Sequence, residues 1–288
     1  MINLNGINVK NPFFIGSGPA KYGRGYGIHE NPISFFLYRS RTIKPELFGG
    51  VTSKTLTLPP HKGNYRWYAP WRVIKKLDDG WANKFGWSNC GFYYFHTHEY
   101  PTIIKKLNNL IISIGAIDNY NESLEMINLA NEMKILAVEV NISCTNVHIS
   151  YRDNRKQLSN FFSEAVKRSR HPLIVKLGPE KDMASFIIKA IIAEQAGINA
   201  LCMINTVPTE IKGFGHCGKS GFGIKKIALE LIEKTASTIK IPIIGGGGIM
   251  NMEDCYEFFN AGAQAIYFAS IFFTHPLRPQ KIIKSLYK

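Results

Sequence analysis

Eight short apolar runs alternate with longer segments of helical period, and this alternation constrains the fold more than any other feature of the chain. Such runs are typical of parallel strands, and the segments between them are typical of crossover helices. The pattern predicts an α/β fold, a (β/α)8 TIM barrel. The expected strands are 13–17, 51–57, 111–115, 137–143, 173–177, 200–205, 241–245 and 264–269.

Helical periodicity fills the gaps between these strands. Asn119 with Glu122, and Asn251 with Asp254, have the spacing of a capping box at a helix N-terminus. No linker, repeat or low-complexity tract interrupts the pattern, so we expect a single domain over 1–288. The expected helices are 121–134, 157–169, 181–196, 224–238, 252–261 and 278–287, with weaker signals near 32–40 and 99–108.

The net charge of +14, from 35 basic and 21 acidic residues, raises the question of nucleic-acid binding. The basic residues are scattered in short pairs, such as Lys105 with Lys106, and form no dense block. Strong nucleic-acid binders usually carry a clustered stripe or a known motif. We therefore expect no nucleic-acid partner; the alternative, a functional basic face, predicts affinity that falls steeply with salt.

The N-terminus and the cysteines bear on where such a chain works. No basic stretch leads into an apolar run at the N-terminus, and no window approaches the roughly 18 apolar residues that a spanning helix needs. The five cysteines include no C-x-x-C pair, which argues against disulfides and against zinc or iron–sulfur sites. We expect a cytoplasmic protein without a membrane partner or a metal ion.

Polar residues gather where the fourth expected strand ends, at Asn141, Ser143, Cys144 and Asn146. In a barrel the loops that follow the strands share one face, where active sites are found. A cysteine abstracts a proton when its pKa is brought towards neutrality, and asparagine offers a donor and an acceptor to a planar ring with alternating N–H and C=O groups. The alternative is a buried cysteine packed as a small apolar residue beside turn-forming asparagines.

Two lysines end apolar strands, Lys54 the second and Lys176 the fifth, and Asn205 closes the sixth. A lysine inside an apolar strand is costly to bury unless it meets a negative partner. An anionic ligand or an electron-rich cofactor would supply that partner. Alternatively, the side chain reaches the rim of the barrel or pairs with a carboxylate such as Glu139.

A run of four glycines, 245–248, follows the seventh strand and precedes a helix signal. Successive glycines let backbone N–H groups approach a phosphate, and the loops after strands seven and eight are the recurrent phosphate site of this architecture. The turn 218–223 would supply further N–H groups. The alternative is a sharp turn without a ligand.

The longest stretch with neither strand nor helix pattern is 58–96, which is rich in aromatic residues, glycine and asparagine. A loop of this length in a compact domain is usually functional or disordered, and the aromatic residues argue against disorder. Asn83 offers an amide, and Gly86 permits close approach of the backbone to a ligand. The alternative is a compact loop held by its own aromatic side chains.

Taken together, these segments resemble the dihydroorotate dehydrogenases, in order and over nearly the whole chain. Cysteine at 144, where other members have serine, resembles the soluble class of that family, class 1. The residues that carry the resemblance are Asn11-Pro12, 16–18, 54–57, 83–92, 141–146, Lys176-Leu177, 204–206, Ser220-Gly221, Ile224-Lys225, 242–249 and Glu253-Asp254.

The resemblance implies FMN as the cofactor, with Lys176 stabilising negative charge on the reduced flavin, and Cys144 as the base that takes the C5 proton while the C6 hydride passes to flavin N5. The implied cofactor-binding residues are Ser17, Gly18, Lys54, Thr55, Asn141, Lys176, Ile204, Ser220, Gly221, Gly247, Gly248, Ala269 and Ser270. The implied substrate-binding residues are Lys54, Asn83, Phe85, Gly86, Trp87, Asn141, Asn146, Asn205 and Thr206. The implied activity is the oxidation of dihydroorotate to orotate in pyrimidine biosynthesis.

The sequence departs from the family pattern at several of these positions. Thr145 replaces the usual proline after the cysteine, and Phe85 and Trp87 are bulkier than the residues usual there. His61 replaces an arginine, and 269–270 reads Ala-Ser where Gly-Thr is typical. The first two departures bear on the placement of Cys144 and on the identity of the substrate.

Alternative functions therefore stay open. A related flavin enzyme would act on another dihydropyrimidine, such as dihydrouracil. A barrel without redox chemistry would keep the phosphate site as a lyase or a binding subunit. The resemblance also implies a homodimer, and it leaves fumarate, a quinone or a partner electron-transfer subunit as the electron acceptor.

Overall fold

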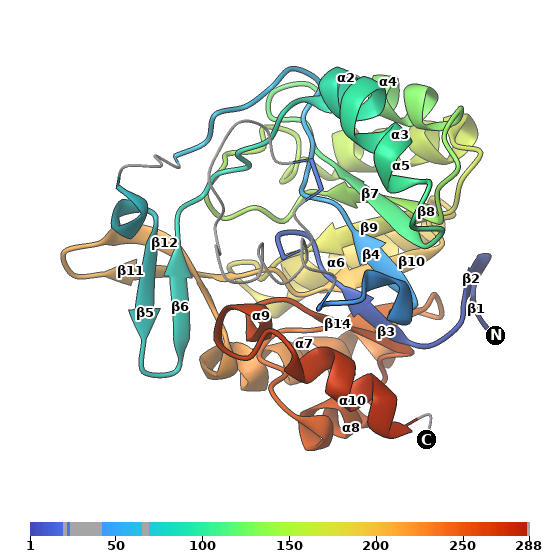
Figure 1. Cartoon of the computed structure of the whole chain (residues 1–288). Coiled ribbons are helices and arrows are strands. Elements are labelled where there is room, and N and C mark those ends of the chain that lie inside the picture. Colours follow the sequence, from blue (N-terminus) through green and yellow to red (C-terminus); the bar gives the residue numbers. More distant parts are fainter. Residues whose placement is uncertain (20–21, 24–41, 65–68, 287–288) are drawn as a thin grey trace.

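A closed barrel of parallel strands forms the centre of the molecule (Figure 1). The computed structural model describes residues 1–19, 22–23, 42–64 and 69–286. Around the barrel the strands follow the order β10-β13-β14-β3-β4-β7-β8-β9, so that the last barrel strand, β14, pairs with the first barrel strand, β3. The barrel strands are β3 (Phe13–Ile15), β4 (Gly50–Thr52), β7 (Leu110–Ile114), β8 (Ala137–Asn141), β9 (Leu173–Leu177), β10 (Ala200–Met203), β13 (Ile243–Gly245) and β14 (Ala265–Phe268).

All eight strands predicted from the sequence are present, and the (β/α)8 barrel is confirmed. Several strands end earlier than predicted, because the chain leaves the ladder before its apolar run ends. At β4 the backbone N–H of Lys54 turns away to the carbonyl of Tyr22, at 2.8 Å, and the chain rejoins the barrel only where Leu56 bonds to Ser113. β8 and β10 likewise stop at Asn141 and Met203.

Helices surround the barrel, and six of the predicted helices are confirmed with shifted ends. The weak signal near 99–108 corresponds to an earlier helical stretch, 92–103, and the signal near 32–40 lies outside the described residues. The α-helices are α2 (Phe92–Tyr94), α3 (Tyr100–Ile103), α4 (Asn121–Ala130), α5 (Arg155–Arg168), α6 (Met183–Gln195), α7 (Lys225–Ala236), α8 (Met252–Asn260), α9 (Ile271–Thr274) and α10 (Arg278–Leu286). Short 3-10 turns η1 (Pro45–Leu47), η2 (Pro70–Arg72) and η4 (Phe222–Ile224) and the π-turn η3 (Phe95–Glu99) complete the helical elements.

Two smaller sheets, not expected from the sequence, lie at opposite ends of the barrel (Figure 1). The hairpin of β1 (Ile2–Leu4) and β2 (Ile7–Val9) packs against the apolar barrel interior near the amino ends of the strands. A four-stranded antiparallel sheet in the order β11-β12-β6-β5 lies beyond the strand carboxyl ends. Its strands are β5 (Ile74–Leu77), β6 (Gly80–Asn83), β11 (Val207–Ile211) and β12 (Gly215–Ser220). It ties the loop after β4 to the loop after β10.

The barrel interior changes from apolar to polar along its strands. Residues at alternate positions of a strand face the same side, so the interior of β8 is formed by Ala137, Glu139 and Asn141 in succession. Ala137 belongs to an apolar cluster with the N-terminal hairpin, whereas Glu139 and Lys176 are buried polar residues closer to the carboxyl ends of their strands. The sequence therefore places its buried polar groups towards the strand carboxyl ends.

Among the described residues, no helix is both long and apolar enough to cross a membrane.

The capping box predicted at Asn251 is confirmed. The Asn251 side chain accepts from the backbone N–H of Asp254 at 2.8 Å, and the Asp254 carboxylate accepts from the backbone N–H of Asn251 at 3.2 Å. The one predicted at Asn119 is wrong, because α4 begins one residue later than that spacing requires, and Asn119 instead accepts from the backbone N–H of Asn121.

Replacing Asn251 with alanine is expected to lower the free energy of unfolding by about 1 kcal/mol, because the backbone N–H of Asp254 at the start of α8 loses its side-chain partner. The melting temperature should fall by about 2–4 °C. Thermal unfolding followed by circular dichroism measures this. Asn260→Ala, at the exposed end of the same helix, is the matched control and should leave the melting temperature within about 1 °C of the unmodified protein.

Candidate active site

A cavity opens between the carboxyl ends of the barrel strands and the four-stranded sheet. It encloses about 1200 Å³, its open mouth included. Every residue singled out from the sequence as a cofactor or substrate contact lines it. The structure thus brings together segments from one end of the chain to the other, from Ser17 to Ser270.

Each of these residues comes from the end of a strand or from the loop that follows it. Ser17 and Gly18 follow β3, Lys54 and Thr55 follow β4, Asn83 ends β6, and Phe85, Gly86 and Trp87 come after it. Asn141 ends β8, with Cys144 and Asn146 beyond it, and Lys176 lies in β9. After β10 come Ile204, Asn205 and Thr206. Ser220 ends β12, and Gly221 follows it. Gly247 and Gly248 follow β13, and Ala269 and Ser270 follow β14, which completes the ring.

Several residues of the cavity wall were missed by sequence reasoning. Trp81 of β6 and Phe273 of α9 both line the cavity, and their rings lie 5.7 Å apart. Ile74 of β5 lies on the same side of the cavity. Neither β5 nor β6 has a sequence pattern from which a strand was predicted. Tyr267 was within reach of prediction, since it occupies an inward position of an expected strand. Pro19, Ile224 and Ile249 complete the missed residues.

A chain of hydrogen bonds connects the buried polar layer to the cavity. Glu139 accepts from the Ser113 hydroxyl at 2.8 Å, and the Ser113 and Thr55 hydroxyls lie 3.0 Å apart. Thr55 Oγ1 accepts from the Asn141 amide at 2.7 Å. Because all four residues are buried, these bonds fix the orientation of the Asn141 side chain.

The same chain continues into the loop that carries Cys144. The Asn141 carbonyl oxygen accepts from both the backbone N–H and the hydroxyl of Ser143, at 3.0 and 2.6 Å. Asn205 donates to the Ser143 hydroxyl at 2.8 Å, and its own carbonyl oxygen accepts from the backbone N–H of Thr206. Asn141 at the end of β8 and Asn205 after β10, on either side of β9, are therefore oriented together.

Asn83 and Asn146 form a second pair of amides across the cavity. The Asn146 amide donates to the backbone carbonyl and to the side-chain oxygen of Asn83, at 3.2 and 3.3 Å. Asn83 in turn donates to the carbonyl of Gly218 in β12. The four-stranded sheet thus sets the position of both amides relative to the barrel.

The long aromatic segment after β6 is held by Asn89, which is buried. Its side-chain oxygen accepts from the backbone N–H groups of Thr57 and Gly91, and its amide donates to the carbonyl of Trp87 at 2.7 Å. The ring of Trp87 packs over Gly115, where a Cβ atom would lie 2.5 Å from the indole. A small residue at 115 is therefore required for this loop conformation.

Lys176 is almost completely buried, with 4% of its surface exposed, so it does not reach the rim of the barrel. Its ammonium group donates to Ser17 Oγ at 2.9 Å and lies 5.4 Å from the centre of the Tyr267 ring. Within the part of the chain that the structure describes, it forms no ion pair with Glu139 or another carboxylate. Its position suits a negatively charged ligand group in the cavity. Lys54 is also buried at the cavity wall.

The glycine run after β13 brings backbone to the cavity surface. Gly247 and Gly248 have φ angles of +127° and +93°, which side-chain-bearing residues rarely adopt. A Cβ atom on Gly248 would lie 2.8 Å from the carbonyl oxygen of Gly221, so the two loops approach too closely for any side chain. The N-terminus of α8 follows four residues later.

Cys144 lies three residues beyond β8 and is buried, with 7% of its surface exposed. Burial raises the pKa of its thiol to about 11, and the backbone N–H groups of Asn146 and Val147 and the charges of Lys176 and Arg152 oppose that rise. The thiol is therefore neutral near pH 7. It remains a proton acceptor only through the small thiolate fraction that these groups maintain.

The alkylation rate of Cys144 by iodoacetamide is expected to rise about tenfold for each pH unit between pH 7 and 10, because the thiolate is the reactive form and its pKa lies above this range. Mass spectrometry of the peptide that contains Cys144 measures the rate. Glutathione, an unburied thiol, is the reference whose rate levels off above about pH 9. A plateau for Cys144 below pH 9 would contradict the raised pKa.

A barrel whose polar groups gather around a cavity at the strand carboxyl ends has the architecture of an enzyme of the (β/α)8 class. A sequence profile described as dihydroorotate dehydrogenase matches residues 1–288. The chain belongs to the dihydroorotate dehydrogenase family, whose members are flavin-dependent oxidoreductases. This confirms the family resemblance seen in the sequence.

Individual relatives agree with this assignment. The chain is 31% identical to "Dihydroorotate dehydrogenase B (NAD(+)), catalytic subunit" of Thermodesulfovibrio yellowstonii, over 99% of this chain and 91% of the relative. It is 32% identical to the protein of the same name in Bacteroides thetaiotaomicron, over 96% and 88%. A dihydroorotate dehydrogenase crystal structure from Eimeria tenella, in complex with ferulenol, superimposes with a TM-score of 0.78 at 18% identity, covering 99% of this chain and 82% of that one; it supports the fold.

Proposed function

We propose that this protein oxidises dihydroorotate to orotate in pyrimidine biosynthesis, as a single FMN-binding domain. The observation that carries the proposal is the convergence, in a member of this family, of the Cys144 thiol, paired asparagine amides and the buried Lys176 ammonium on one cavity. Each supplies one requirement of the reaction: a base, recognition of a planar ring, and a positive charge beside an electron-rich group.

The residues present fit FMN. Lys176 is a buried cation without a carboxylate partner among the described residues, and Gly247 and Gly248 leave backbone groups uncovered at the cavity surface. These two glycines, with Ala269 and Ser270, would hold the phosphate. When bound, FMN would supply the hydride acceptor. The other proposed contacts to it are Ser17, Gly18, Lys54, Thr55, Asn141, Ile204, Ser220 and Gly221.

The substrate would bind among the four asparagine side chains. An amide offers both a donor and an acceptor, which suits the alternating N–H and C=O groups of a dihydropyrimidine. Asn141 and Asn205 are oriented by Ser143 and Thr206, and Asn83 and Asn146 by each other and by β12. Lys54 and the 85–87 backbone would meet the substrate carboxylate.

Cys144 would act as the base in this scheme, its Sγ atom accepting the proton that leaves C5 of the substrate. The positive charges of Lys176 and Arg152 favour the thiolate that the step requires. Ser143 donates to Asn141 and accepts from Asn205, and these hydrogen bonds hold the residue immediately before the cysteine. The chain itself thus orients both the base and the ring whose proton it removes.

The relatives' names guide the proposal for the electron acceptor. They are catalytic subunits of enzymes named for NAD(+), which supports a partner subunit that carries electrons from this chain. We also propose a homodimer and a cytoplasmic location, in keeping with the family resemblance.

An anaerobic visible spectrum before and after addition of dihydroorotate tests the proposal. Dihydroorotate is expected to bleach the flavin band of the purified protein, and dihydrouracil, which lacks the carboxylate, is expected to leave it oxidised. Bleaching by dihydrouracil alone would transfer the proposal to another dihydropyrimidine. A protein that takes up no FMN on reconstitution would favour a non-redox barrel.

Cys144→Ala is expected to retain the flavin but to slow its reduction by dihydroorotate about 10²- to 10⁴-fold, because the base is lost while the phosphate site is untouched. Stopped-flow absorbance measures the reduction rate. Cys217→Ala, a buried cysteine on β12 that does not line the cavity, is the control and should reduce at close to the unmodified rate. Equal rates for the two variants would remove Cys144 from the mechanism.

A further inference from the structure

The loop that carries Cys144 runs over 142–154, from β8 to α5, and both of its ends must be ordered for the thiol to be placed. Thr145 follows the cysteine and, unlike a proline, has no ring that fixes its φ angle. Asn141 holds the loop only up to Ser143. The carbonyl of Cys144 itself accepts from the Arg152 guanidinium, at 3.4 Å, from the far end of the loop.

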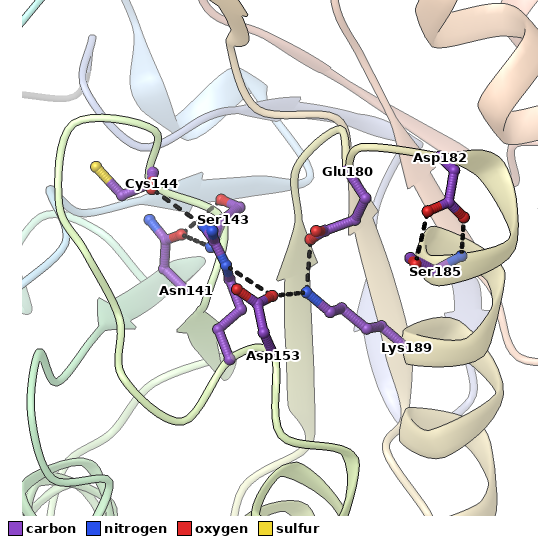
Figure 2. Close-up of polar contacts among 9 residues, drawn as sticks. Asn141, Ser143, Cys144, Asp153, Glu180, Asp182, Ser185 and Lys189 are labelled. Carbon is purple, nitrogen blue, oxygen red and sulfur yellow. Dashed lines mark hydrogen bonds and ion pairs between the residues drawn. The ribbon is translucent and has the colours of Figure 1, made fainter.

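Lys189 of α6 reaches the far end of this loop. Its ammonium group donates to Asp153 at 2.8 Å and to Glu180 at 2.7 Å, and only 7% of the residue is exposed (Figure 2). The N-terminus of the helix that carries Lys189 is capped, because the Asp182 side chain accepts from the backbone N–H of Ser185 at 2.7 Å. Lys189 therefore joins the loop to a rigid element that is not part of it.

The contact continues from Lys189 to the cysteine. Asp153 Oδ1, which accepts from Lys189, also lies 3.5 Å from Arg152 Nε. Burial alone would raise the pKa of Asp153, but the hydrogen bond and charge of Lys189, and the charge of Arg152, hold it below its usual value. Asp153 is thus an anion shared by two cations, of which one touches the Cys144 carbonyl.

We propose that Lys189 is a positioning residue for Cys144, acting through Asp153 and Arg152. The inference rests on the proposed role of Cys144 as the base. Lys189 neutralises Asp153 and Glu180 together, so that Asp153 orients the guanidinium without drawing it away from the Cys144 carbonyl.

Without Lys189, the Asp153 carboxylate would compete with the Cys144 carbonyl for the Arg152 guanidinium. The guanidinium would move towards the uncompensated carboxylate, releasing the carbonyl and weakening one of the positive charges that favour the Cys144 thiolate. The other is Lys176 of β9, which does not contact this network and would be unchanged. Both the placement and the ionisation of the thiol would suffer.

The test compares Lys189→Met with the unmodified flavin-loaded protein by alkylation of Cys144 with iodoacetamide at pH 9, measured by peptide mass spectrometry. The rate is expected to fall about threefold to tenfold, because the thiolate fraction falls with a rise in the thiol pKa. Lys167→Met removes a surface ion pair of α5 and is the matched control, expected to leave the rate unchanged. An unchanged or increased rate in Lys189→Met would overturn the proposal, since Lys189 would then at most restrain opening of the loop.

A double variant separates positioning from general stabilisation. In an Arg152→Gln background, Lys189→Met is expected to cause no further fall in the alkylation rate, because the guanidinium that connects Asp153 to the Cys144 carbonyl is already absent. An equal fall in both backgrounds would show that Lys189 acts on stability alone and would overturn the proposal.

A milder variant keeps the test decisive if Lys189→Met does not fold. Asp153→Asn, at a residue whose side chain is 66% exposed, removes the carboxylate that orients the Arg152 guanidinium and leaves the pair of Lys189 with Glu180 intact, so it should also slow alkylation. Lys189→Arg preserves the charge and should retain most of the unmodified rate. If neither prediction holds, the proposal fails.

The alkylation assay does not depend on the substrate. A protein whose flavin is not reduced by dihydroorotate would contradict the proposed function, whereas the alkylation rates would still decide whether Lys189 positions Cys144. In a protein that is active, Lys189→Met should lower kcat about threefold to tenfold and leave KM within about twofold, because the asparagine contacts to the substrate are untouched.

Discussion

The structure depends on the burial of ionisable groups inside the barrel, near the carboxyl ends of its strands. Parallel strands turn every second residue inward, and in this chain that alternation places Glu139 and Lys176 in the interior. Such groups are tolerated in an apolar interior only when hydrogen bonds or charges satisfy them. Glu139 is satisfied by Ser113, and the bonds that follow from Ser113 through Thr55 to Asn141 orient the mouth of the barrel. Lys176 points towards the cavity and is satisfied there by Ser17.

Much of this arrangement was predictable, because it is written in local patterns. The apolar runs predicted all eight barrel strands, and since parallel strands share one carboxyl end, residues as distant as Ser17 and Ser270 were expected at one site. The ends of the strands were not predictable. Residues 51–57 read as one apolar run, but the backbone of Lys54 bonds to Tyr22, and no local pattern reveals such a partner.

The outer wall of the cavity was missed for a related reason. β6 and β12 are short and contain no continuous apolar run, and they become strands only within a sheet, β6 between β5 and β12, and β12 between β6 and β11. Trp81 therefore showed no signal of its place in the wall. The network of Lys189 was equally hidden, because a lysine in a helical segment ordinarily indicates a solvated face, and its burial depends on Asp153 and Glu180 from two separate loops.

The pairing of β14 with β3 has a consequence for the synthesis of the chain. Phe268 pairs with Ile15 to close the barrel, so β3 lacks one of its two neighbours until the residues of β14 have left the ribosome. During that time an apolar strand edge is open to pairing with other chains. Phe13 and Ile15 are fully buried in the finished barrel, and they are the residues whose protection comes last. Of the barrel strands, β3 therefore has an unpaired edge for the longest part of synthesis.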